Sequence, residues 1–245
     1  MDEPELSESG NPIYRYNKDQ ENKFTPASGD GENIDAIDAH ITQHIGPVEM
    51  VFHEIVSDQV HIDIHWVKAT AERPYHVLVT SGMSDKSMNT PQEADIPQHL
   101  ELCMLLPVEW KIDEKSFKDE NNYWPIRWMK IIARFPHQYN TWVGWGHTIP
   151  NGENAAGFAS ATKLGCMILL PSLNLPHDFF ELKTGSKTIA FFCLYPLYKE
   201  EMDFKLKNGT DRLLDKFEEA GISDIVDINR PNSCAPQKKG LFGLW

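Results

Sequence analysis

Two histidines and an aspartate alternate along one apolar stretch, at His61, Asp63 and His65. Side chains of a β-strand alternate between its two faces, so this spacing places all three polar groups on one face. Imidazole and carboxylate groups together suit zinc or iron. The pattern therefore allows one interpretation in which the chain is a metal-dependent enzyme, with His147 as a further ligand.

The same stretch has a simpler interpretation as the polar face of a half-buried strand. Val60, Ile62, Ile64 and Trp66 would then point to the core from the opposite face. Neighbouring side chains on one face leave the strand in parallel directions, and seldom converge on one ion without ligands from elsewhere. We favour this interpretation, in which the chain binds no metal and no cofactor.

Nucleophile motifs in the sequence are incomplete. Ser84 lies in the turn Gly82-Met83-Ser84-Asp85, which lacks the second glycine of a nucleophile elbow. No glycine-rich segment continues into the Lys-Ser/Thr pair of a phosphate-binding loop. We therefore predict that the chain is not an enzyme.

A loop rich in tryptophan and glycine carries a signal for binding. Trp142 and Trp145 stand beside Gly144 and Gly146, and His147 follows directly. Loops carry function more often than core elements do, and tryptophan is enriched where proteins bind each other. In the alternative interpretation both indoles anchor the loop to the core, and the sequence leaves this choice open.

Hydrophobic periodicity predicts that strands and helices alternate irregularly along the chain. Asn33 is a suitable first cap, and Trp124-Pro125 opens a second helix that Pro136 ends. The predicted helices span 33–45, 124–135, 197–206 and 210–220. The predicted strands span 48–56, 60–66, 75–80, 101–106, 164–170 and 186–195.

Three regions follow from this pattern. Residues 1–32 are polar and charged, and we predict a flexible acidic leader. Residues 33–231 form one α+β domain, because strands and helices are interspersed without a linker. Residues 232–245 form a flexible tail with an apolar end, Leu241–Trp245, that could bind a partner or its own domain.

Charge and cysteine content exclude several classes of function. The net charge is -13, from 36 acidic and 23 basic residues, and it disfavours nucleic-acid and membrane-surface partners. Cys103, Cys166 and Cys193 lie in apolar runs, and Cys234 is isolated, so no disulfide framework or zinc motif is expected. The sequence contains neither a secretory signal nor a run of about 20 apolar residues, and we predict a cytoplasmic protein.

Several segments, taken in order over about residues 47–231, resemble the suppressor-of-fused family. No single segment is specific, but their order along the chain is. They are the strand 76–80 with the turn Gly82–Asp85, the strand 101–105, the helix from Trp124-Pro125 to Phe135, the loop Asn140–Thr148, the apolar run 188–197 and the stretch Ile225–Arg230.

The resemblance implies a central mixed β-sheet flanked by α-helices and no catalytic activity. Animal members of the family bind a short peptide of Hedgehog-pathway transcription factors, and hold these factors in the cytoplasm. The compact form resembles bacterial members, which are proposed to act as immunity proteins against toxin domains. A protein or peptide partner is therefore expected at seven residues: Gly82, Met83, Ser84, Asp85, Trp142, Trp145 and His147.

The sequence departs from the family at one position of this loop. Animal members carry an acidic residue directly before the loop histidine, where it helps to hold the peptide. Gly146 occupies that position here, next to Trp145. The resemblance therefore implies an apolar contact in place of a charged one, and a partner other than a transcription factor.

Overall fold

A computed structural model describes residues 5–17, 20–91 and 96–235 of the chain. One large sheet dominates it, with strand order β3-β4-β5-β6-β10-β8-β7 and β9 paired to β10. The pairing of β6 with β10 is parallel and the others are antiparallel, so the sheet is mixed as expected. Its strands are β3 (Val48–Phe52), β4 (Asp63–Val67), β5 (Tyr75–Ser81), β6 (His99–Pro107), β7 (Thr148–Pro150), β8 (Leu164–Leu170), β9 (Glu181–Lys183) and β10 (Thr188–Tyr198).

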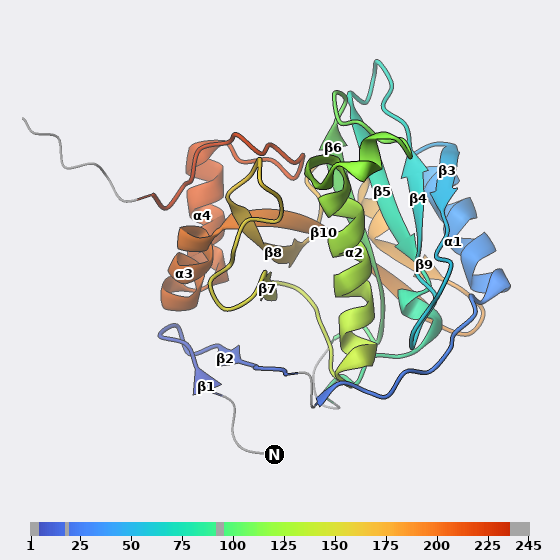
Figure 1. Ribbon diagram of the computed structural model, residues 1–245, viewed down its shortest axis with the longest axis horizontal. Helices are drawn as coiled ribbons and strands as arrows, with labels where there is room; N and C mark the ends of the chain where they lie inside the picture. The colour runs from blue at the N-terminus through green and yellow to red at the C-terminus, as the bar shows by residue number, and fades with distance from the viewer. Residues whose placement is uncertain (1–4, 18–19, 92–95, 236–245) are drawn as a thin grey trace, which may run out of the picture.

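Four α-helices cover the two faces of this sheet, which confirms the predicted α+β class (Figure 1). Helix α2 lies across one face, where Met129 and Ile132 are fully buried. The opposite face is covered by the other three helices, which share a second apolar cluster with the sheet. These helices are α1 (Gly31–His44), α3 (Lys199–Asn208) and α4 (Thr210–Ala220), and α2 spans Glu120–Gln138.

Two helices begin earlier than the sequence predicted. Asp30, and not Asn33, caps α1, because its carboxylate accepts from the backbone N–H groups of Glu32 and Asn33. Asp119 caps α2 in the same way, so that Pro125 and Pro136 lie inside the helix. The aspartate N-caps therefore define where the two helices begin. The prolines did not mark where α2 begins or ends.

The segment before α1, predicted as a flexible leader, lies along the domain where it is described. Its strands β1 (Glu5–Leu6) and β2 (Pro12–Ile13) pair with each other, and the Ser9 N–H donates to the Leu206 carbonyl. The Tyr16 ring lies 5.2 Å from that of Phe135 on α2. These contacts place the segment beneath α2 and α3 in Figure 1.

The segment after α4 returns to the sheet. The N–H of Val226 donates to the carbonyl of Leu105 on β6, and Arg230 forms an ion pair with Glu201 on α3. The apolar end predicted for the tail, Leu241–Trp245, lies outside the described residues. Within the described ranges, no helix combines the length and apolar character needed to span a membrane.

Candidate partner-binding surface

The turn after β5 depends on a glycine that no other residue could replace without rearrangement. Gly82 has φ of +99°, and a Cβ there would lie 1.7 Å from the carbonyl oxygen of His61. Only glycine combines a left-handed conformation with this close approach. A short 3-10 turn, η2 (Met83–Asp85), follows directly.

A buried carboxylate holds this turn in place. Both the N–H and the hydroxyl of Ser84 donate to Oε1 of Glu101, at 2.9 and 2.7 Å, and the Thr80 hydroxyl donates to Oε2 at 2.6 Å. Burial raises the pKa of Glu101 to about 7, although hydrogen bonds from Ser84 and Thr80 oppose the shift. Glu101 thus fixes the turn to β6.

The turn residues differ in what a partner could reach. Gly82, Met83 and Ser84 are buried, and only Asp85 is partly exposed. The Asp85 carboxylate accepts from the Asn33 side chain at 2.6 Å and from the Asp30 N–H at 3.1 Å, while burial raises its pKa. A partner at this turn would therefore meet Asp85, and the other three residues would support it.

Hydrogen bonds connect the turn to the tryptophan loop through the end of α2. The ring of His137 lies 2.9 Å from the Met83 carbonyl, and burial lowers the pKa of His137 to about 4. The backbone and side-chain N–H groups of Asn89 donate to the carbonyls of Thr141 and Asn140. These hydrogen bonds connect the chain on either side of the two segments, at His137 and Asn89, and the single surface stays a prediction.

The two tryptophans of the loop have different environments. Trp142 is partly buried, and its ring lies 4.2 Å from the ring of His147. Trp145 is 50% exposed. Each interpretation of the loop thus fits one residue, because Trp142 packs as an anchor and Trp145 presents its indole to solvent.

Gly146 brings the loop close to the helical pair α3–α4. Its φ is +73°, and a Cβ there would lie 3.1 Å from the hydroxyl of Thr210, the first residue of α4. The Gly146 N–H donates to the Leu169 carbonyl, and the Leu169 N–H donates to His147. The loop is thereby fixed to β8 on one side and to α4 on the other, and a larger residue at this position would strain both contacts.

The loop histidine lies in an unusual electrostatic setting. Burial, and then the nearby ammonium of Lys205 on α3, lower the pKa of His147 to about 4. Lys205 is itself only 8% exposed. No sequence pattern pointed to Lys205, because a lysine in a polar helix is normally solvated.

Two of the three residues of the predicted metal site, His61 and Asp63, contact each other, whereas His65 binds elsewhere. The ring nitrogens of His65 lie 3.2 Å from Asp38 on α1 and 3.0 Å from the Ser81 hydroxyl, so both are in use. Asp38 of α1 contacts His65, and the loop between β3 and β4 encloses Asp63, so the two side chains are 1% and 2% exposed. Val60, Ile62, Ile64 and Trp66 point to the core as predicted, but the strand is not half-buried, because its polar face is buried as well.

Asp63 binds two histidines, of which the sequence indicated only one. His61 lies 3.0 Å from one of its oxygens and His53 lies 2.9 Å from the other. The second ring nitrogen of His61 lies 2.7 Å from the Ser57 hydroxyl, which is buried beneath residues 25–27. These hydrogen bonds hold the loop between β3 and β4 together.

Metal binding by this group is not supported. Within the ranges that the structure describes, no three His, Cys, Asp or Glu side chains are arranged to hold a metal ion. His147, the proposed further ligand, directly precedes β7, whereas Asp63 and His65 belong to β4 near the opposite edge of the sheet. Residues so far apart in the strand order do not share a ligand sphere.

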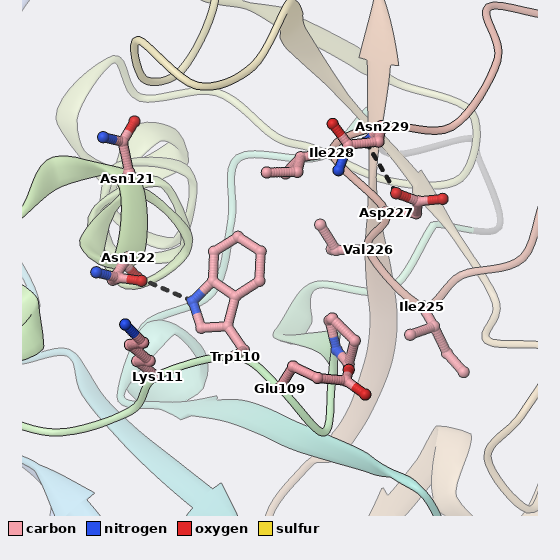
Figure 2. A pocket seen from close by; sticks show the side chains of 11 residues that line it. Glu109, Trp110, Lys111, Asn121, Asn122, Ile225, Val226, Asp227, Ile228 and Asn229 are labelled. Atoms are coloured by element: carbon pink, nitrogen blue, oxygen red, sulfur yellow. Dashed lines mark hydrogen bonds between the residues drawn. The ribbon is translucent and has the colours of Figure 1, made fainter.

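A pocket of about 630 Å³, shown in Figure 2, is lined by none of the predicted site residues. Trp110, Val226 and Ile228 provide its apolar lining, and Glu109 and Asp227 are at its margin. The Trp110 indole N–H donates to the Asn122 carbonyl at 3.0 Å, which fixes the ring against α2. The sequence analysis missed this pocket, since the stretch after α4 and the loop after β6 meet only in the tertiary structure.

Comparison with known proteins finds a matching family and structures of similar fold. The family model described as suppressor of fused protein (SUFU) matches residues 58–231. An uncharacterized protein of Ureaplasma parvum serovar 3 is 25% identical over 199 residues, which cover 78% of this chain and 90% of the relative.

Solved structures with a similar fold include a SUFU homologue from Neisseria gonorrhoeae FA 1090, with a TM-score of 0.61 and 16% identity over 82% of this chain and 97% of that chain. A structure of the Sufu–Fu complex gives a TM-score of 0.59 and 15% identity, with coverage of 82% and 92%. Drosophila Suppressor of Fused gives a TM-score of 0.57 and 15% identity over 84% of this chain and 54% of that chain.

Proposed function

The chain belongs to the suppressor of fused family, and from this membership we propose that it is a non-catalytic domain that sequesters or neutralises a protein partner. One observation carries the proposal. Trp145 exposes half of its side chain on a loop that hydrogen bonds hold to β8. An exposed indole on a rigid loop loses little conformational entropy on binding, and is therefore suited to anchor a partner.

The surface that we assign to the partner consists of Trp145, Trp142, His147 and Asp85. Trp145 makes the contact, and Trp142 supports it by packing on the ring of His147. Asp85 lies at the other end of the surface, connected through the end of α2. A similar fold that was solved in the Sufu–Fu complex supports a role in binding another protein.

We propose a toxin domain as the partner, which makes the chain a bacterial immunity protein of the cytoplasm. The similar proteins from Ureaplasma parvum and Neisseria gonorrhoeae support a bacterial setting. The net charge of -13 favours a basic protein over nucleic acid or an anionic membrane. Toxin domains that cleave nucleic acids would provide such a basic surface.

Affinity purification of the tagged protein from its native cells, followed by mass spectrometry, tests this proposal. We expect a stoichiometric partner with a toxin domain. Trp145→Ala should weaken capture at least tenfold, because truncation of a central indole typically costs about 2 kcal/mol or more. Leu173→Ala is a matched control, since Leu173 is an exposed apolar residue on another loop.

The pocket in Figure 2 provides the competing location for the partner. Ile228→Ala changes its lining without touching the tryptophan loop. If Ile228→Ala loses capture and Trp145→Ala keeps it, the partner binds at the pocket and not at the tryptophan loop. Capture of no protein by the unmodified chain would refute the binding function itself.

A further inference from the structure

The pocket in Figure 2 combines a fixed aromatic ring with two aliphatic side chains. The Trp110 indole lies between Asn122 on one side and Val226 and Ile228 on the other. Its N–H donates to the Asn122 carbonyl at 3.0 Å, and its ring meets that of Trp124 edge-on at 5.7 Å. The volume of about 630 Å³ is within the range, roughly 300–1,000 Å³, of pockets that bind compact ligands. The pocket is therefore formed before an apolar group enters it.

The margin of the pocket carries more acidic than basic groups. Glu109 and Asp227 line it, and Lys111 is the basic residue, so the margin has a net charge of -1. Among the described residues, neither carboxylate forms an ion pair. Asp227 accepts the N–H of Asn229 at 2.8 Å. An apolar group that is preceded by basic residues would fit both parts of the pocket.

The sequence that follows the described residues has this composition. Lys238 and Lys239 come first, and after Gly240 follows the apolar segment Leu241–Trp245, with the sequence Leu-Phe-Gly-Leu-Trp. Residues 236–245 contain no acidic side chain, although the whole chain has a net charge of -13. The apolar segment therefore matches the interior of the pocket, and the two lysines match its margin.

The chain leaves the described domain six residues after the pocket. Asn229 of the pocket precedes Ala235 by six residues, and Leu241 follows Ala235 by another six. An extended chain covers about 3.3–3.6 Å per residue, so each of these stretches spans at most about 22 Å. Ser233 donates its N–H and hydroxyl to Oε1 of Glu201, at 3.0 and 2.9 Å, which fixes the point of departure. The apolar segment can therefore return to the pocket.

We infer that the apolar segment Leu241–Trp245 occupies this pocket in its own chain. Its side chains pack on the Trp110 ring and on Ile228, and the two lysines before it lie at the acidic margin. The inference is independent of the proposed function, because none of the residues assigned to the partner lines the pocket.

Attachment favours this segment over a separate peptide of the same composition. A short flexible linker holds a tethered group at an effective concentration of about 1 mM. A site with a Kd of only about 0.1 mM is then occupied by the attached segment for about nine-tenths of the time. The segment of a second copy, at a micromolar protein concentration, competes poorly with the attached one.

Nuclear magnetic resonance of the full chain tests the contact from the side of the segment. The double replacement Phe242→Ser with Trp245→Ser, here the tail variant, changes no residue that lines the pocket, so the domain keeps its fold. We expect the Trp110 indole and Ile228 methyl signals to differ between the unmodified chain and the tail variant. Gln237→Ser is the control in the same stretch of chain and should leave both signals unchanged.

A peptide added to the protein measures the competition. The probe is N-acetyl-Lys-Lys-Gly-Leu-Phe-Gly-Leu-Trp amide, which reproduces residues 238–245. It should bind the tail variant saturably and shift the Trp110 and Ile228 signals. Its binding to the unmodified chain should be at least tenfold weaker, because the attached segment competes at about 1 mM.

Charge reversal tests the position of the lysines. Lys238→Glu with Lys239→Glu places like charges at the acidic margin, so the Ile228 signal should move towards its position in the tail variant. Glu109→Lys, added to this change, should reverse part of that movement, and Glu109 is an exposed residue that the fold does not need. Glu32→Lys, at an exposed position of α1 on the opposite face of the sheet from α2, is the matched control and should reverse none of it.

Three results would overturn the inference. The Trp110 and Ile228 signals could be identical in the unmodified chain and the tail variant, or the peptide could bind both chains equally. The difference between the two chains could also vanish when the protein is diluted, which would assign the segment to the pocket of a second copy. Capture of a partner by the tryptophan loop is measured separately, so none of these results refutes the proposed function.

Discussion

Trp142 and Trp145 belong to one short loop, but their surroundings assign them different roles. Trp142 lies against His147, and Trp145 is half exposed. The sequence could not distinguish the two residues. Residue type indicates that a side chain is suited to binding, but it does not indicate whether the fold exposes that side chain to solvent. The same holds for His53 and Ser57, whose hydrogen bonds to Asp63 and His61 no spacing rule indicated.

Buried histidines make stability depend on pH. His137 has a pKa lowered to about 4 by burial, with the charges of Lys86 and His99 acting in the same direction. Its ordinary value is 6.5, so between these values the unfolded chain binds a proton that the folded chain does not. The stabilising contribution is complete above pH 6.5, and is lost as the pH falls towards 4.

Urea unfolding at two pH values measures this contribution. His137 should account for about 1 kcal/mol of the free energy of unfolding lost between pH 7.5 and 5.5, at about 1.36 kcal/mol for each pKa unit. His137→Gln keeps a donor towards the Met83 carbonyl and cannot titrate, so its loss over this range should be smaller by that amount. His177→Gln, at an exposed position, is the control, and an equal loss in both variants would contradict the assignment.

Among the elements, the turn after β5 connects the sheet to the proposed surface. Glu101 holds Ser84, and the Met83 carbonyl lies against His137. The turn was predicted as part of the contact surface, but three of its four residues are buried. Its contribution to binding is therefore expected to be the position of Asp85 and of the loop after α2.

Gly82→Ala tests how strongly this turn depends on glycine. Both a positive φ and a clash with the His61 carbonyl oppose the methyl group, and we expect a loss of more than about 2 kcal/mol in the free energy of unfolding. Gly221→Ala has a positive φ and open space, so it should lose only about 1 kcal/mol. If the two variants lose a similar free energy of unfolding in urea, the contact with the His61 carbonyl does not contribute to the loss.

At the scale of the whole molecule, the stretch after α4 closes the domain. The guanidinium of Arg230 donates to both carboxylate oxygens of Glu201, at 2.7 and 2.6 Å, and to the Pro196 carbonyl at 2.9 Å. Both residues are buried, at 9% and 0% exposure. The chain beyond α4 is therefore attached to α3 and β10, close to where the family match ends.

Loss of Arg230 should destabilise the whole domain. Arg230→Ala leaves the Glu201 carboxylate buried without its partner, and we expect a loss of about 3–5 kcal/mol in chemical unfolding. The double replacement Arg230→Met with Glu201→Gln removes both charges and should lose less than Arg230→Ala alone. Lys199→Ala breaks an exposed pair of the same helix and should have little effect. A larger loss in the double variant would show that the pair itself is strongly stabilising.

The sequence by itself determined the α+β class and most of the central strands, because continuous apolar runs such as Leu164–Leu170 have few other places in a folded chain. It also located the tryptophan loop, and the order of its segments indicated the family. Helix starts were less certain, since Asp30 and Asp119 act as caps through side-chain geometry that composition does not reveal.

Only the tertiary structure decided which polar residues are available to a partner. Asp38 of helix α1 binds His65, and the loop between β3 and β4 encloses Asp63, although the strand pattern predicts a polar face that is open. The two sides of the pocket, at Trp110 and at Ile228, likewise come from segments far apart in the chain. Burial results from packing between elements, and local sequence patterns do not contain that information.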